Sequence, residues 1–283
     1  MSHARQRAVS SAKKSTPLGV LFGALISAMA RTPLSKRLPA RFATLFHFGG
    51  ATPSAMRVFA LRALPVLGLL GLVSCSTTPP VPDWQLASHG QMRLALQSYL
   101  VGDDRVAALE LGRVRVEVAA TGQLPLAARV ELARCAVQVA SLDFSPCVSY
   151  ARFAQDAGPQ ERAYATLLAA DSVANLASLE ATQLPPSYAP VLPLFRRSAT
   201  PATSASLGSV VDPLSRLIAA GVLLRTGQMG PADMSVALQT ASDQGWRRPL
   251  LAWLGVALKL AETAGDVAAQ GQLRRRIELV GGQ

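Results

Sequence analysis

Apolar residues recur at helical spacing through most of the chain after residue 83. Leu126, Val130, Ala133 and Val137 follow one another at intervals of four or three residues, which places them on one face of a helix. The same spacing recurs within 107–118 and 250–264, and no comparable run alternates apolar and polar residues as a half-buried strand does. The pattern predicts an all-α fold with helices at 84–101, 104–121, 125–142, 146–156, 160–181, 213–226, 231–244, 249–264 and 266–280.

Prolines lie where these helices are expected to begin. Proline is tolerated at the first helical position because its missing N–H would have no partner there. Glycine precedes it at Gly158-Pro159 and Gly230-Pro231, where one helix can end before the next begins. Pro125 and Pro159 are 34 residues apart, while Pro213, Pro231 and Pro249 follow at intervals of 18. A unit of about 34 residues is the length of a tetratricopeptide helix hairpin.

Two short motifs carry a resemblance to tetratricopeptide-type proteins. Tyr99-Leu-Val-Gly102-Asp103 followed by Ala107 resembles the turn of that repeat and the small residue after it. Trp253-Leu254-Gly255 is similar to the Trp-x-x-Leu-Gly start, although the tryptophan is displaced and no unit matches the full consensus. The resemblance covers roughly residues 84–280. It implies antiparallel helix hairpins stacked as a TPR-like solenoid, with an irregular helical bundle as the alternative.

The segment 182–211 interrupts the helical pattern. It holds five prolines and a run rich in serine, threonine and alanine, which is typical of a loop or linker. Thirty residues is long for a loop within one compact domain. We therefore expect it to join a helical lobe at 83–181 to a second lobe at 212–283. A flexible connection is the favoured reading, and a partner-binding segment is the alternative.

Charge is distributed unevenly along the chain. The 28 lysines and arginines exceed the 17 acidic residues, giving a net charge of +11. Ten of the basic residues and none of the acidic residues lie in 1–74, so 75–283 has a net charge of only +1. The basic balance therefore does not indicate a nucleic-acid partner for the helical part. A hydrophobic content of 50% excludes wholesale disorder.

The N-terminal region has the order of a bacterial lipoprotein signal. Arg57 and Arg62 precede an apolar stretch at 63–73, which is too short to span a bilayer. It ends in the sequence Leu72-Val73-Ser74-Cys75, which resembles the lipobox of that family. The resemblance implies a signal peptide at 56–74, cleavage before Cys75 and acylation of Cys75. An ordinary secretory signal with a chance cysteine is the alternative.

The residues around this signal predict a start site and a location. Counted from Met56 the signal has an ordinary length, so we expect 1–55 to be a start-site artefact or a disordered basic extension. Residues 75–82 read as a lipidated tether. In Gram-negative lipoproteins Asp after the cysteine favours retention in the inner membrane, and this chain has Ser76 there. The resemblance therefore implies an outer-membrane protein that faces the periplasm, with the inner membrane as the less favoured site.

Two cysteines remain after Cys75. Cys135 lies late in one predicted helix and Cys147 early in the next, across a short turn. In an oxidising compartment such neighbours favour a disulfide. Two separately buried thiols are the alternative.

Candidate catalytic residues are few after residue 75. His89 is the single histidine there, and the common hydrolase, metalloprotease and nucleotide-binding motifs are absent from the sequence. Asp103-Asp104 is expected to cap a helix, and Arg274-Arg275-Arg276 to lie on a solvated face. The candidate partner contact is Trp246-Arg247-Arg248, since Trp and Arg anchor interfaces, although an interhelical turn with a packed Trp is the favoured interpretation.

These observations favour a non-catalytic binding or scaffold lipoprotein. We expect it to serve an envelope-assembly or cell-wall complex through an unidentified envelope protein or peptide. No cofactor, metal or nucleic acid is expected, and the membrane contact is the lipid on Cys75. The alternative is an envelope hydrolase that uses carboxylates between the two lobes.

Overall fold

The computed structural model describes residues 83–196 and 207–282, and within these ranges every regular element is a helix. The all-α prediction is confirmed for this part of the chain. The predicted signal segment, Cys75 and its lipobox residues Leu72, Val73 and Ser74 lie outside the described residues. In the two described ranges, no helix has the length and apolar character needed to cross a membrane.

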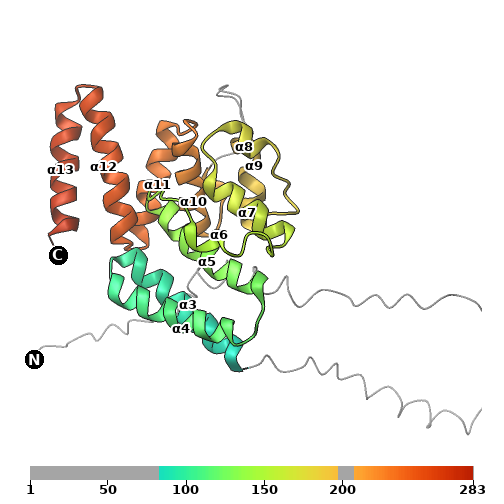
Figure 1. Ribbon diagram of the computed structural model, residues 1–283. Helices are drawn as coiled ribbons and strands as arrows, with labels where there is room; N and C mark the ends of the chain where they lie inside the picture. The colour runs from blue at the N-terminus through green and yellow to red at the C-terminus, as the bar shows by residue number, and fades with distance from the viewer. Residues whose placement is uncertain (1–82, 197–206, 283) are drawn as a thin grey trace, which may run out of the picture. The chain divides into compact units, whose positions relative to one another are not determined.

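Figure 1 shows the helices in their order along the chain. In order they are α3 (Asp83–Val101), α4 (Asp104–Ala119), α5 (Leu124–Ala140), α6 (Val148–Ala151), α7 (Pro159–Ala169), α8 (Val173–Ala177), η3 (Pro186–Val191), α9 (Leu192–Phe195), η4 (Leu207–Ser209), α10 (Pro213–Arg225), α11 (Pro231–Asp243), α12 (Arg247–Thr263) and α13 (Val267–Gly281).

The helix starts follow the chemistry expected from the sequence. Proline occupies the first or second position of α5, α7, α10 and α11. Asp103, Asp212 and Asp266 each accept a hydrogen bond from the backbone N–H three residues further on, at 3.0, 2.8 and 2.9 Å. Each carboxylate thus satisfies one of the backbone donors that a helix leaves free at its N-terminus.

Two predicted helices are shorter in the structure. The range 160–181 is divided, because α7 ends at Ala169 and α8 begins only at Val173. Between them, the Asn175 side-chain oxygen accepts bonds from the Ser172 hydroxyl at 2.7 Å and the Asp171 N–H at 3.4 Å. Such side-chain bonds compete with the helical ladder. The range 146–156 is helical only in α6.

Residues 182–211 were predicted as a linker. The structure describes 182–196 and 207–211 of this segment, and both parts contribute buried residues to the core. Tyr188, Val191, Phe195, Leu207 and Val210 have no exposed surface. They belong to η3, α9 and η4 or lie directly beside them, and these elements contact α8, α10 and α11. Proline predicted a loop here, but short 3₁₀ turns tolerate proline and leave the apolar residues between prolines free to pack.

One hydrophobic cluster includes residues from both ranges predicted as lobes. Helix α5 contacts α3, α4, α6, α7 and α10. Gly221 permits the approach of α10, because a Cβ there would lie 2.5 Å from the carbonyl oxygen of Val139. Trp253 of α12 donates its indole N–H to the carbonyl oxygen of Ala140 at 3.2 Å. Helix α5 therefore links α3 and α4 to α7 and α10.

Candidate functional site

Two pockets open along α4 and α5, and we call the surface formed by their lining residues the α4–α5 groove. The first pocket has a volume of about 430 Å³ and the second about 390 Å³. Arg115 lines both. The first is also lined by Val118, Ala119, Gly122, Gln123, Leu124, Ala127, Val130, Glu131, Arg152 and Phe153. The second is also lined by Ala95, Leu96, Tyr99, Asp104, Ala107, Ala108, Leu111, Arg134, Val137 and Ser149.

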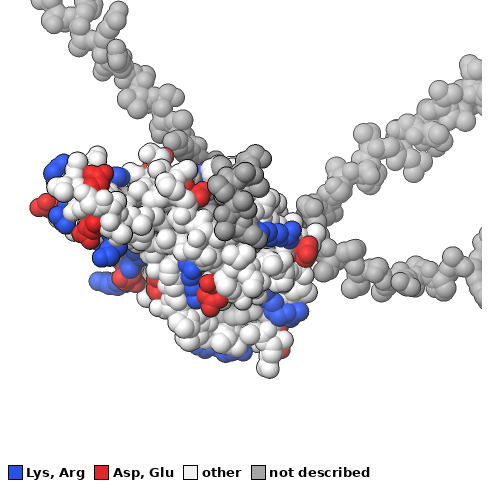
Figure 2. Space-filling view, turned by 90° about the horizontal axis from the view of Figure 1, so that it is seen from above, with Lys and Arg blue, Asp and Glu red and all other residues white. Residues whose placement is uncertain are grey.

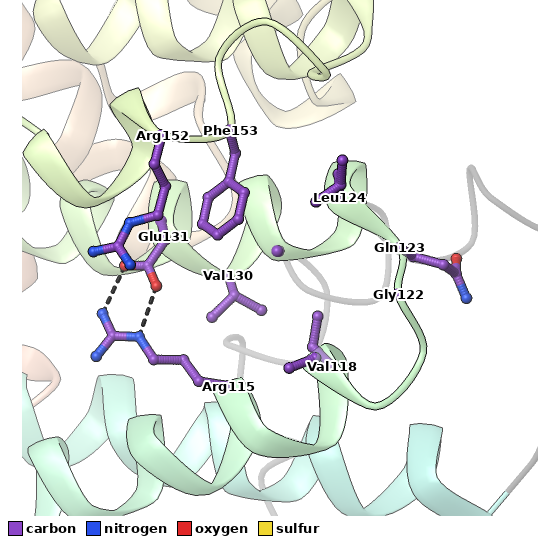
Figure 3. A pocket seen from close by; sticks show the side chains of 11 residues that line it. Arg115, Val118, Gly122, Gln123, Leu124, Val130, Glu131, Arg152 and Phe153 are labelled. Carbon is purple, nitrogen blue, oxygen red and sulfur yellow. Dashed lines mark hydrogen bonds and ion pairs between the residues drawn. The ribbon is translucent and has the colours of Figure 1, made fainter.

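The first pocket is apolar inside with guanidinium groups at its edge (Figure 3). Val118 comes from α4, Leu124 and Val130 from α5, and Phe153 from the turn after α6. The guanidinium of Arg152 lies 5.8 Å from the centre of the Phe153 ring. Among the described residues Arg152 has no carboxylate within ion-pair distance. Its charge therefore remains to be balanced by solvent or by a ligand.

A bidentate ion pair stands between the two pockets. Nε and Nη2 of Arg115 donate to the two carboxylate oxygens of Glu131 at 2.6 and 2.7 Å, as the dashed lines in Figure 3 mark. Burial alone would raise the pKa of Glu131, but hydrogen bonds from Arg115 and Ser149 hold that pKa below its ordinary value. The Glu131 side chain is 6% exposed and that of Arg115 is 43% exposed, so a ligand in the groove would meet the arginine.

The predicted disulfide between Cys135 and Cys147 is present, with 5.9 Å between the two Cα atoms. The bond ties Cys147, the residue before α6, to the second half of α5; we call residues 147–153 the α6 segment. That segment carries Ser149, which lines the second pocket, and Arg152 and Phe153, which line the first. The bond therefore fixes one wall of the α4–α5 groove. Sequence analysis predicted the bond but not this consequence.

The residues predicted as a partner contact, Trp246, Arg247 and Arg248, lie against α3 and the turn after it. Trp246 is 1% exposed and its indole N–H donates to Oε1 of Gln97 at 3.2 Å. Nε of Arg248 donates to the carbonyl oxygen of Tyr99 at 2.7 Å, and its guanidinium lies 4.3 Å from the centre of that ring. Arg247 reaches the same turn. These contacts join distant parts of the chain, and the buried Trp246 has almost no surface to offer a partner.

His89 and Arg274, which the sequence also singled out, lie outside both pockets. His89 is partly buried, and burial together with the neighbouring charge of Arg93 lowers its pKa. Arg274 donates to Glu262 on the adjacent helix at 3.0 Å, in a largely exposed pair. The described ranges contain no group of three or more His, Cys, Asp or Glu side chains placed to hold a metal ion.

A second polar cluster is buried where α7, η3 and α10 meet. The hydroxyl oxygens of Tyr164 and Tyr188 lie 3.3 Å apart, and neither side chain reaches solvent. Asp212 accepts the Ser215 N–H through Oδ2, while its Oδ1 is buried without a hydrogen-bond partner among the described residues. Burial raises the pKa of Asp212. The cluster opens into neither pocket of the α4–α5 groove.

Charge is mixed over the described surface. Figure 2 shows basic and acidic side chains interspersed on the face in view, with wide areas that carry neither. This agrees with the near-neutral balance of residues 75–283. The lining of the α4–α5 groove is also mixed, because three arginines (Arg115, Arg134, Arg152) accompany two carboxylates (Asp104, Glu131), and both carboxylates are in ion pairs.

Sequence analysis did not identify Arg115, Glu131 or Arg152 as functional candidates. One signal was present, since Glu131 lies between the apolar residues Val130 and Leu132 in α5. A buried carboxylate needs a cationic partner, and the sequence could not say which arginine supplies it. The pocket walls also come from segments whose contacts depend on tertiary packing.

Comparison with protein-family models, with curated proteins and with solved structures finds no match to this chain. The geometry of the α4–α5 groove therefore carries the functional conclusion.

Proposed function

We propose that this protein is a lipid-anchored, non-catalytic binding protein that holds a segment of an envelope protein in the α4–α5 groove. The observation that carries the proposal is the pair of apolar pockets joined at Arg115. Concave, mostly apolar sites with a few placed polar groups are the usual form of a binding site. The described helices supply a rigid frame for such a site, and hairpins are the usual frame of scaffold proteins.

The charge chemistry of the groove favours binding over catalysis. Glu131 is the buried carboxylate of the first pocket, and both of its oxygens accept bonds from Arg115. Such an engaged carboxylate with a lowered pKa is a poor proton donor at neutral pH. We infer that the pair orders the groove, while Arg152, which has no carboxylate within ion-pair distance among the described residues, presents positive charge to a partner.

The anchor and the location in this proposal rest on the sequence Leu72-Val73-Ser74-Cys75 followed by Ser76. Thioether acylation at Cys75 would hold the helical part at the periplasmic face of the outer membrane, by a tether of eight residues at 75–82. Several acyl chains hold a protein far more firmly than one. We further propose that the helix hairpins form an irregular bundle and not an open TPR-like row, because α3 contacts α12.

Affinity capture from envelope membranes tests the proposal. The bait is the mature, lipidated protein, and the matched baits carry Ala119→Phe or Ala120→Phe. Both alanines are exposed near the end of α4, but only Ala119 lines the first pocket. We expect a partner to be captured by the wild type and by Ala120→Phe and to be lost with Ala119→Phe. Equal capture by all three baits would refute a role for the groove.

A further inference from the structure

We infer that one side of the helix hairpin formed by α3 and α4 lies against the lipid bilayer and turns the α4–α5 groove toward the periplasm. This side carries Leu86, Leu94, Leu109 and Val116, and we call it the α3–α4 outer face. The inference rests on the proposed function, because it uses the lipid anchor at Cys75. The partner is the boundary between head groups and acyl chains of a phospholipid bilayer.

The α3–α4 outer face is apolar and open. Its four side chains are between 48% and 69% exposed, and none of them lines either pocket of the groove. Helix α4 packs mainly against α3 and α5, and Figure 1 shows α3 and α4 at one edge of the described helices. The exposure of all four side chains means that no described element covers this side of the hairpin.

Helical rotation places the α3–α4 outer face away from the groove. Successive residues of an α-helix are rotated by about 100°, so Leu109 points about 140° away from the mean direction of the α4 residues that line the second pocket. Val116 follows two turns later and points about 125° away. On α3, Leu86 and Leu94 point about 130° and 150° away from the residues that line the same pocket. A membrane on the outer face therefore leaves the groove accessible.

The predicted tether brings this side of the hairpin within reach of a bilayer. Cys75 lies eight positions before Asp83, where α3 begins, and eight extended residues span at most about 28 Å. Leu86 lies in the first turn of α3, and Val116 lies in the last turn of α4. Because α3 and α4 form a hairpin, both side chains lie at the end of it that is nearest to the anchor.

The charges along the outer side of α4 do not decide the contact. Arg105 and Arg113 lie four residues before and after Leu109, and Arg113 pairs with Glu110 at 2.6 Å. Glu117 follows one turn later, so two arginines accompany two glutamates. The arginine stems can cover apolar surface while their guanidinium groups extend to lipid phosphates. Apolar burial therefore drives the contact, which should depend little on the fraction of anionic lipid.

The anchor makes a weak contact sufficient. Partial burial of four such side chains corresponds to a dissociation constant on the order of millimolar for an untethered chain. Attachment through a short linker supplies an effective concentration of the same order. The anchor also brings the bilayer within reach of every molecule, whereas a second copy of the chain is not tied to it. A chain that begins at Ser76 and carries no lipid should not bind vesicles measurably.

Spin-label accessibility tests the inference on the full mature chain. Protein acylated at Cys75 is placed in vesicles of phosphatidylethanolamine and phosphatidylglycerol, and a nitroxide-labelled cysteine replaces Leu94 or Leu109. The controls are labels at Ala108, the exposed neighbour that lines the second pocket, and at Leu279, which is 72% exposed on α13. The natural cysteines do not react, because one is acylated and the other two are bonded to each other.

The expected result follows from where the two relaxing reagents partition. Oxygen concentrates in the bilayer, whereas a nickel chelate stays in water. The ratio of oxygen to nickel collision rates should be several-fold higher at Leu94 and Leu109 than at the two control positions. The double variant Leu109→Glu, Val116→Glu changes only exposed side chains and should fold normally. It should abolish the excess at Leu94, while the lipid still holds the protein on the vesicles.

Three results would overturn the inference. One is an equal ratio at all four labelled positions, and another is an excess at Leu94 that survives the two glutamates. The third is a low collision rate with both reagents at Leu109 together with dipolar broadening between labels, which would show a second copy on this side.

Envelope capture separates this inference from the proposed function. If capture is lost with Ala119→Phe but the collision ratios are equal, the groove stands and the bilayer contact falls. If the ratios differ as expected but capture is insensitive to Ala119→Phe, the bilayer contact stands and the groove falls. An unmodified Cys75 in mass spectrometry would remove the anchor and this inference together.

Discussion

Removal of the disulfide between Cys135 and Cys147 tests how the α4–α5 groove is built. The double variant Cys135→Ala, Cys147→Ala deletes the bond without leaving a free thiol. Cys135 is 4% exposed and alanine retains its Cβ, so the packing change is small. The variant mainly releases the α6 segment, which carries Arg152 and Phe153, from the middle of α5.

The magnitude follows from the length of the closed loop. The two cysteines are 12 positions apart, and closing a loop of that size lowers the entropy of the unfolded chain by an amount equivalent to about 3 kcal/mol at 25 °C. The free energy of unfolding should therefore fall by about 3 kcal/mol in the double variant. Wild-type protein treated with a dithiol reductant should show the same loss, because the same constraint is removed.

Urea denaturation followed by circular dichroism measures the free energy of unfolding of the wild type and of the double variant. Alkylation and mass spectrometry establish that the untreated wild type holds no free thiol at either cysteine. Capture of an envelope partner by the double variant should also be weaker, since one wall of the first pocket is no longer held. A loss below about 1 kcal/mol, together with unchanged partner capture, would refute the reasoning.

Three further variants, one with a matched control, test the packing and the buried charges. Gly221→Ala should lower the free energy of unfolding by about 2 kcal/mol, because its Cβ would meet a backbone carbonyl of α5. Its control is Gly255→Ala, which has open space around the added Cβ and should be neutral or stabilising. Arg129→Met should lower the free energy of unfolding, measured by urea denaturation, by about 3 kcal/mol. The reason is that Glu161, whose side chain is 3% exposed, would lose its ion-pair partner. Asp212→Asn keeps the helix cap and removes the buried charge.

The pH dependence at Asp212 has a defined sign. Because burial raises the pKa of this carboxyl, the folded chain retains its proton at pH values where the unfolded chain has lost it. Its contribution to stability is complete below the unfolded pKa and is lost as pH rises through the folded pKa. The free energy of unfolding of Asp212→Asn minus that of wild type should therefore increase from acidic to neutral pH. A difference that stays constant with pH would contradict the assignment.

Local sequence chemistry predicts most of the helices. Asp103 caps a helix as predicted, and Pro159 and Pro231 open α7 and α11. These features depend on neighbours within one turn, which the sequence displays directly. The exception near Asn175 has the same origin, since polar side chains there replace helical hydrogen bonds.

Tertiary packing explains what the sequence did not reveal. Tyr188 and Phe195 lie in a proline-rich segment that reads as a loop, yet α8 and α10 bury them. The sequence favoured a packed Trp246 over an interface anchor, but it could not name Gln97 as the acceptor of its indole N–H. The α4–α5 groove depends on Arg115 meeting Glu131 from another helix, a pairing that no local pattern specifies.

The most direct test of the α4–α5 groove as the binding site is site-specific photo-crosslinking of the lipidated protein in its native envelope. A photoreactive residue is introduced at Ala119, which lines the first pocket, or at Val116, which is 69% exposed and lines neither pocket. The proposed function predicts an adduct with an envelope protein from position 119 and none from position 116. An adduct from position 116 with none from position 119 would contradict it.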